Sequence, residues 1–378
     1  MGCSTEMETR MPYRSDRPAG EVGIDVFFDT MPQLGASDLH LKVSSPIMMR
    51  IGGVLRSLDM PPVTVEQAES LAFSILNDDQ REVLQATGSV DLAHSTAKEC
   101  RVRVNIFYQR GVVSMAARYV NPVVPTFEEL LMPAATLKRI CKSDSGLVVL
   151  AGATGSGKST TLAAMIDHIN HTRKCHILTL EDPIEYIFQD DKALINQREI
   201  GIDADTFESA LKYALREDPD VILMGEMRDA ETVATGLGAA ETGHLVFGTL
   251  HAASAPQAIG RLLDLFPGDR QRQVRKSLVF NLRAVLCQKL LRSMKPGRRR
   301  VPAYEMMICT PPIQKYIDEG EDQKIHDVMR RSGSEGMIDF THSIHDLVQR
   351  HLVTKREALA NAPNPDALQS LFDGLEIN

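Results

Sequence analysis

Nine residues near the middle of the chain, 152–160, have the types and spacing of a phosphate-binding loop. They read GATGSGKST and match the pattern G-x-x-x-x-G-K-[ST]. In such a loop the backbone amides face a polyphosphate, Lys158 neutralises its charge, and the hydroxyl of Ser159 is a ligand for Mg²⁺. The residues predicted to bind a nucleotide are Gly152, Thr154, Gly155, Ser156, Gly157, Lys158, Ser159 and Thr160.

The segments on either side of this loop give the pattern its meaning. Residues 146–151 (GLVVLA) are typical of a buried strand, and residues 159–171 carry apolar side chains at helical spacing. A strand, a glycine loop and the N-terminus of a helix together form an anion site. A glycine-rich turn that matches by chance is the alternative, but the sequence favours binding of ATP with Mg²⁺.

A second constellation ends on an acid. Residues 221–224 (VILM) predict a buried strand that delivers Glu226 to its carboxyl end, where ligands lie in open α/β sheets. P-loop hydrolases need an acid there to orient and deprotonate the attacking water. Gly225 stands where an aspartate usually ends this strand, so Mg²⁺ contact has to come from Ser159, water or another acid. A solvated acid at a strand end is the alternative.

A third acidic strand end is LTLEDPIE, residues 178–185, in which Glu181 and Asp182 leave an apolar strand and Pro183 stops it. Because the carboxyl ends of parallel strands meet at one edge, one of these acids can position water or Mg²⁺. Solvated acids are again the alternative.

Two histidines and two arginines complete the candidate residues. His244 and His251 bracket an expected strand, LVFGTL, and either sense the γ-phosphate, contact a neighbouring subunit or serve only as structural hydrogen-bonding residues. Arg103 and Arg118 lie on facing strands expected in the N-terminal domain. Such arginines can reach a nucleotide held on the other domain and stabilise charge on its γ-phosphate, or they are simply sheet-surface side chains.

A basic cluster surrounds Pro296-Gly297. We expect either a solvated hairpin loop or a contact with acidic lipid or an acidic partner at a membrane. Its members are Lys289, Arg292, Lys295, Arg298, Arg299 and Arg300.

Composition narrows the class of protein. The net charge of −8 over 378 residues argues against a general nucleic-acid-binding surface, so no nucleic-acid partner is expected. The six cysteines are scattered without a C-x-x-C pair, which favours reduced thiols and no zinc site. No apolar run is long enough to span a bilayer, and the first residues lack a signal sequence. We therefore expect a cytoplasmic protein.

The pattern along the chain predicts several parts. Residues 1–20 are expected to be a mobile tail, 21–120 a small α+β domain, and the proline-containing stretch 121–133 a linker. Over residues 134–310 strands alternate with helices, which predicts an α/β core with a parallel sheet covered on both faces. Residues 311–378 are expected to be helical. The strands expected in the core lie near 146–151, 176–181, 220–225, 245–250 and 301–309.

The order of these motifs resembles that of the secretion ATPases of type IV pilus and type II secretion systems. GATGSGKST, LTLEDPIEY, GEMRDAET and AAETGHLVFGTLHA follow one another behind a small sheet domain. The similarity spans about residues 30–350 and is strongest to the type IV pilus retraction (twitching motility) ATPases, PilT and PilU. It implies a PAS-like N-terminal domain joined to a RecA-like core in a homohexameric ring.

The resemblance also implies roles and partners. By position, Glu226 is the catalytic glutamate, the acids at 181–182 lie in the Asp box, and the two histidines lie in the His box. The two arginines at 103 and 118 match N-domain arginines that reach the nucleotide. The implied function is an ATP-hydrolysing motor that drives pilus disassembly at the cytoplasmic face of the inner membrane, by acting on a platform protein there.

One segment departs from the family. PilT-type motors carry an A-I-R-N-L-like segment where this chain has PIQKY at residues 312–316, and PilU-type proteins depart there too. The chain is therefore either a primary motor or an accessory one beside a second retraction ATPase. Alternatives are a pilus-assembly or type II secretion ATPase, disfavoured by the missing four-cysteine motif, and a RecA-like nucleic-acid translocase.

Overall fold

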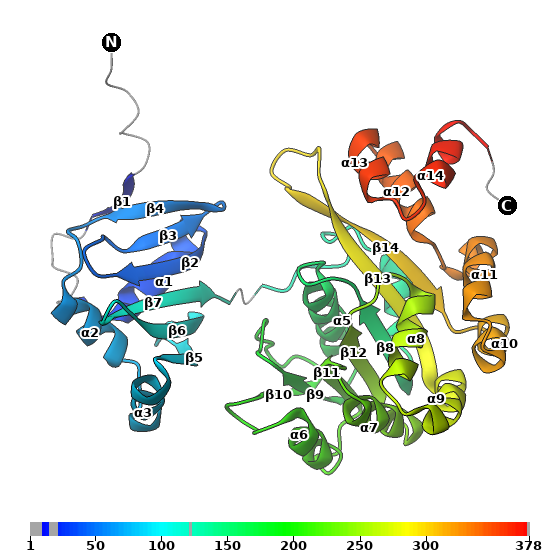
Figure 1. Ribbon diagram of the computed structural model, residues 1–378, viewed down its shortest axis with the longest axis horizontal. Helices are drawn as coiled ribbons and strands as arrows, with labels where there is room; N and C mark the ends of the chain where they lie inside the picture. The colour runs from blue at the N-terminus through cyan, green and yellow to red at the C-terminus, as the bar shows by residue number, and fades with distance from the viewer. Residues whose placement is uncertain (1–9, 15–21, 121–122, 376–378) are drawn as a thin grey trace. The chain divides into compact units, whose positions relative to one another are not determined.

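The computed structural model describes residues 10–14, 22–120 and 123–375, and the chain forms two compact units, Met1–Pro122 and Val123–Asn378 (Figure 1). Most of the tail expected over residues 1–20 lies outside the described residues. Within it, Arg10–Arg14 form a short strand, β1, parallel to β4.

In the part of the N-terminal unit that the structure describes, a seven-stranded sheet is accompanied by three helices. The sheet has the order β1-β4-β3-β2-β7-β6-β5, and its pairs are antiparallel except β1 with β4. Its core gathers apolar side chains from both the helices and the sheet, among them Phe27, Phe28 and Leu39. Its remaining elements are α1 (Ile24–Leu34), β2 (Ala36–Lys42), β3 (Met48–Ile51), β4 (Val54–Asp59), α2 (Val65–Phe73), α3 (Asp78–Thr87), β5 (Ser89–Ser95), β6 (Arg101–Gln109) and β7 (Val112–Tyr119).

The C-terminal unit is built on a second seven-stranded sheet, with the order β10-β9-β11-β12-β8-β13-β14. All neighbouring pairs are parallel except β13 with β14. Its strands are β8 (Gly146–Ala151), β9 (His176–Glu181), β10 (Leu194–Glu199), β11 (Val221–Glu226), β12 (Leu245–Leu250), β13 (Leu282–Arg292) and β14 (Arg300–Ile308).

Helices cover both faces of this sheet, as the alternating pattern predicts. One face packs against α4 and α5, and the other packs against helices from α6 onward. The helices are α4 (Ala134–Ile140), α5 (Lys158–Thr172), α6 (Phe207–Ala214), α7 (Ala230–Glu241), α8 (Ala255–Asp264), α9 (Gly268–Asn281), α10 (Pro311–Glu319), α11 (Ile325–Arg331), α12 (Phe340–Gln349), α13 (Lys355–Asn361) and α14 (Pro365–Phe372), with single 3₁₀ turns at Asp322–Lys324 and Gly333–Glu335.

In the C-terminal unit two of these strands were not predicted from the sequence, β10 and β13. β10 (LINQRE) lies at the sheet edge and has little apolar character, so its hydrophobic pattern is weak. β13 follows α9 without an intervening loop, because α9 ends at Asn281 and β13 begins at Leu282. No glycine or proline marks that change from helix to strand.

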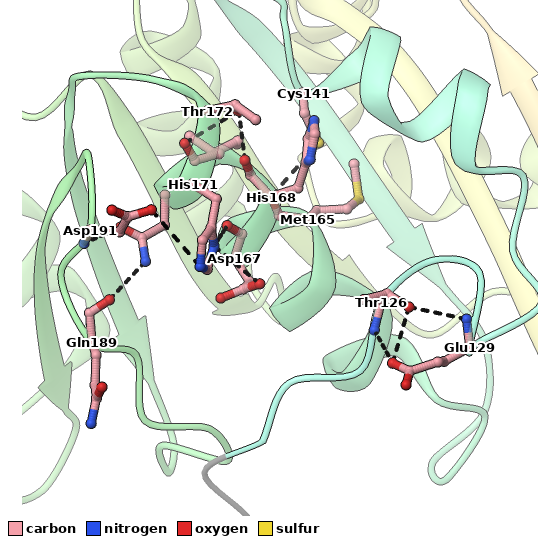
Figure 2. Close-up of polar contacts among 12 residues, drawn as sticks. Thr126, Glu129, Cys141, Met165, Asp167, His168, His171, Thr172, Gln189 and Asp191 are labelled. Atoms are coloured by element: carbon pink, nitrogen blue, oxygen red, sulfur yellow. Dashed lines mark hydrogen bonds and ion pairs between the residues drawn. The ribbon is translucent and has the colours of Figure 1, made fainter.

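The far end of α5 is held by contacts with the chain that leads into β10 (Figure 2). Buried Asn170 donates to the carbonyl of Gln189 at 2.8 Å and accepts from the amide of Asp191 at 3.1 Å. His171 lies near the carboxylates of Asp167 and Asp191, at 3.4 and 3.9 Å. These contacts fix the helix whose opposite end receives the phosphate-binding loop.

We expect Phe247→Ala in β12 to lower the free energy of unfolding by about 3–5 kcal/mol, because it empties a fully buried site between sheet and helices. Phe280→Ala is the matched control, since that ring is 72% exposed. Urea denaturation followed by circular dichroism measures both. Equal midpoints for the two variants would contradict the packing described above.

Candidate functional site

The loop between β8 and α5 has the backbone of a phosphate cradle. All six residues of β8 are buried, and the chain then turns through Gly152 (φ 147°) and Gly157 (φ 94°). A Cβ atom on Gly152 would lie 2.4 Å from the carbonyl oxygen of Gln288, and one on Gly157 would lie 2.6 Å from its Nε2. Both positions therefore require glycine, because of conformation and close approach together.

Gln288 on β13 packs against this loop at Gly152 and Gly157. The residue is 5% exposed, and its Oε1 accepts a hydrogen bond from the Thr161 hydroxyl at 2.9 Å. Gln288 was not predicted from the sequence as a site residue, because β13 was not predicted as a strand. The available signal was a polar side chain inside the apolar run at 282–291.

The residues of the loop fit a polyphosphate. Lys158 Nζ donates to the carbonyls of Gly152 and Ala153 at 2.7 and 3.1 Å, so it already lies over the cradle. Helix α5 begins without a side-chain cap, which leaves its first amides for an anion. The Ser156 hydroxyl is buried and, among the residues that the structure describes, has no hydrogen-bond partner. An anion in the loop would satisfy these donors.

Burial lowers the pKa of Lys158, while the carboxylates of Glu226 and Glu185 oppose that shift. The Lys158 amine therefore interacts electrostatically with acids that follow the neighbouring strands. This follows from topology, since β8, β9, β11 and β12 are parallel and their carboxyl ends share one edge.

Glu226 at the end of β11 is held by an arginine and a histidine. Its Oε2 accepts from Arg228 Nε at 2.8 Å and Nη2 at 2.7 Å, and His251 Nε2 lies 3.1 Å from Oε1. A bulge in the β11–β12 pairing precedes Glu226. The structure thus brings Glu226 and His251 together at the edge that carries the loop. Arg228 was missed, although it lies two residues further along the same GEMRD segment.

Glu181 and Asp182 lie at the same edge, where β9 ends. Glu181 is partly buried and accepts from the Thr179 hydroxyl at 2.7 Å and from Gln197 Nε2 at 3.3 Å. Burial raises its pKa to about 6 despite these hydrogen bonds. Asp182 is exposed, and after Glu226 it contributes to raising the pKa of Arg228.

His244 does not lie with these residues. It precedes β12, and β12 pairs in parallel with β8 so that Leu245 faces Gly146 at the start of β8. Six strand residues, about 20 Å, separate it from the loop of its own chain. Its Nδ1 contacts the Ala239 carbonyl at 2.9 Å, which fixes the end of α7. The expectation that His244 senses a phosphate on its own chain's loop is therefore corrected.

Arg103 and Arg118 face each other on β6 and β7 in the N-terminal unit, as the sequence predicts. Arg118 Nε donates to Asp38 Oδ1 at 2.9 Å, and its side chain is 70% exposed. Burial alone would raise the pKa of Asp38, but hydrogen bonds from Ser37 and Arg118 outweigh burial, so the pKa of Asp38 is lowered. Arg103 is exposed beside this pair.

A family model described as type II/IV secretion system protein matches residues 23–360. This chain belongs to that family. It is 43% identical over 332 residues to the type IV pilus retraction ATPase PilT of Pseudomonas aeruginosa, which covers 88% of this chain and 96% of that relative. It is 38% identical over 342 residues to the type IV pilus ATPase PilU of the same organism, with coverages of 90% and 89%.

A solved structure of the pilus retraction motor PilT with bound ADP matches this secretion ATPase with a TM-score of 0.85 and 41% identity. The match covers 92% of this chain and 98% of the other. The predicted fold class is confirmed, and the protein is a PilT-like, nucleotide-binding ATPase.

The raised pKa of Glu181 predicts how stability of the ATPase varies with pH. Between its ordinary value of 4.5 and about 6, the folded chain holds a proton that the unfolded chain has lost. The free energy of unfolding therefore falls as pH rises through this window and levels off above it. Glu181→Gln removes this loss of stability. The free energy of unfolding of the variant should therefore exceed that of wild type by about 2 kcal/mol at pH 8 and equal it at pH 4.

Denaturation with urea across this pH range measures the difference. Glu82→Gln, on the exposed face of α3, makes the same charge change and should show no such trend. A Glu181→Gln advantage that is constant with pH would contradict the assignment.

Proposed function

We propose that this secretion ATPase is an ATP-driven motor that retracts type IV pili. The observation that carries the proposal is the Glu226 carboxylate, fixed by Arg228 and His251 at the same strand edge as Lys158. Similarity to PilT over nearly the whole chain supports the assignment of the motor to pilus retraction.

The loop residues have separate tasks in this proposal. Lys158 exchanges its bonds to two loop carbonyls for phosphate oxygens, and the first amides of α5 bind the same group. Ser159, the second residue of α5, is the proposed Mg²⁺ ligand. ATP with Mg²⁺, when bound, supplies the phosphoryl group and the cation that offsets its charge.

Glu226 is the proposed general base. A carboxylate beyond the γ-phosphate orients water and accepts its proton. Arg228 and His251 hold both carboxylate oxygens, so the side chain is fixed before substrate arrives. We assign Arg228 as a positioning residue. Glu181 and Asp182 are proposed to position water or the cation at the same edge.

The assembly and its location are also proposals. We infer a homohexamer at the cytoplasmic face of the inner membrane that acts on a platform protein, because the family resemblance implies it. Among the described residues no helix is long and apolar enough to cross a bilayer. We further propose a boundary between a PAS-like domain and the RecA-like core at residues 121–133, and the two compact units support it.

Glu226→Gln should abolish ATP hydrolysis while nucleotide affinity stays close to wild type, because the amide cannot accept the proton. Phosphate release and binding of a fluorescent nucleotide measure the two effects. Glu208→Gln on the exposed surface of α6 is the matched control. Cells carrying only the Glu226 variant should keep excess, non-retracting pili, and normal retraction there would refute the motor role.

Arg228→Gln should lower kcat by about tenfold to a hundredfold with little change in KM, because Glu226 loses the guanidinium that orients it. Arg228→Lys should recover only part of the rate, since lysine has no fork of two donors. Arg216→Gln, at an exposed arginine of the same unit, is the control. A rise in KM with unchanged kcat would assign Arg228 to nucleotide binding instead.

A further inference from the structure

The tip of the β13–β14 hairpin concentrates positive charge. Residues 292–300 (RSMKPGRRR), here called the basic tip, contain five cationic side chains and no acid. Since the whole chain carries −8 and this stretch carries +5, the other 369 residues carry −13. The sign of the tip is therefore opposite to that of the rest of the protein.

The hairpin carries this charge away from the sheet. β13 pairs with β8 only as far as Cys287, opposite Ala151, while its pairing with β14 continues to Arg292. Beyond the end of β8 the two strands run on together, and Figure 1 shows the yellow hairpin projecting past the sheet. The projection leaves from the same edge as the phosphate-binding loop.

Backbone contacts hold the tip in place. The Met294 amide donates to the Leu352 carbonyl at 2.8 Å, and the Arg292 amide donates to Glu357 Oε1 at 3.1 Å. Arg298 donates to the Glu129 carbonyl. Lys289, which the sequence analysis grouped with this cluster, lies inward instead, with its amine 4.5 Å from the centre of the Phe340 ring. These contacts hold the backbone of the tip, from which five cationic side chains extend.

These charges are poorly compensated inside the protein. Among the described residues none of the five side chains forms an ion pair. Two acids do lie nearby: the Glu357 carboxylate accepts from the Arg292 amide, and hydrogen bonds from Thr126 together with the charge of Arg298 lower the pKa of Glu129. Arg292 and Arg300 are direct cross-strand partners, an arrangement of like charges that destabilises a hairpin. An external anion shared by the two would offset that cost.

The tip also presents an apolar side chain, since Met294 is 55% exposed among these cations. A cationic surface with an apolar centre matches the boundary between anionic headgroups and acyl chains. A nucleic acid fits less well, because the strongly negative remainder of the chain would repel a long polyanion that extends beyond the tip. We propose that the basic tip docks this protein on an anionic phospholipid bilayer, with Met294 entering the headgroup region.

This proposal goes beyond the motor function, which needs a platform protein but no direct contact with lipid. It predicts strong salt dependence, because the field of the tip reaches only about 8 Å at physiological ionic strength. Because the hairpin extends from the sheet edge that carries the phosphate-binding loop, docking through the basic tip would turn that edge toward the membrane.

The test is co-sedimentation of the full chain with vesicles. Vesicles of phosphatidylglycerol and phosphatidylethanolamine should bind it, and vesicles of phosphatidylcholine should not. Lys295→Gln, Arg299→Gln and Arg300→Gln together should lower the partition coefficient about a hundredfold, since each basic residue near an anionic surface contributes roughly a fivefold factor. Met294→Ser should weaken binding while the charge is unchanged.

A matched control variant removes the same number of positive charges, three, at positions outside the basic tip. Lys192→Gln, Lys212→Gln and Lys276→Gln alter exposed lysines away from the tip and should bind vesicles almost as wild type does. Glu226→Gln should also bind fully, which separates failure of this proposal from failure of the motor assignment.

Several results would overturn the proposal. Equal loss in both triple variants would indicate a general charge effect, and equal binding to neutral and anionic vesicles would exclude headgroup recognition. If inorganic phosphate displaced the protein from vesicles at concentrations well below the salt concentration needed for the same effect, the tip would be assigned to free phosphate. Tip-dependent binding of duplex DNA without vesicle binding would assign it to nucleic acid. A change in oligomer size in the tip variant alone would make the tip a subunit contact.

Discussion

The parallel pairing of β13 with β8 is the contact on which the candidate nucleotide site depends. It brings Gln288 under the phosphate-binding loop, where its carbonyl and side-chain amide leave room only for glycine at positions 152 and 157. Its side chain also accepts from Thr161 in the first turns of α5. The loop is therefore supported by a strand almost 130 residues away, and its shape is a property of the sheet as well as of the GATGSGKST segment.

The same sheet orders the charges around the loop. Parallel strands place the ends of β9, β11 and β12 at one edge, so Glu181, Glu226 and His251 converge although they come from separate segments. Glu226 meets Arg228 and His251 there, whereas Glu181 accepts hydrogen bonds from Thr179 and Gln197, and burial raises its pKa to about 6. The two carboxylates at this edge therefore lie in different surroundings, one paired with an arginine and the other among neutral hydrogen-bond donors.

Beyond this edge, β13 and β14 continue as the hairpin that carries the basic tip. The strand that supports the phosphate loop and the strand that presents the tip are one continuous element, and C-terminal helices hold the tip through Leu352 and Glu357. A load on the tip would therefore act on the element that shapes the nucleotide loop. This continuity gives the proposed motor a short mechanical connection between its chemistry and a membrane surface.

The sequence by itself determined the phosphate loop, the strands that end in Glu181 and Glu226, and the fold class, because glycine spacing and apolar runs are local signals. Gln288 and Arg228 were not predicted, since one lies on a strand that follows a helix without a break signal and the other gains its meaning only from a contact. The two histidines of one segment were separated only by the tertiary structure. Strand β12 runs between them, and its direction takes His251 to the nucleotide edge and leaves His244 at the other.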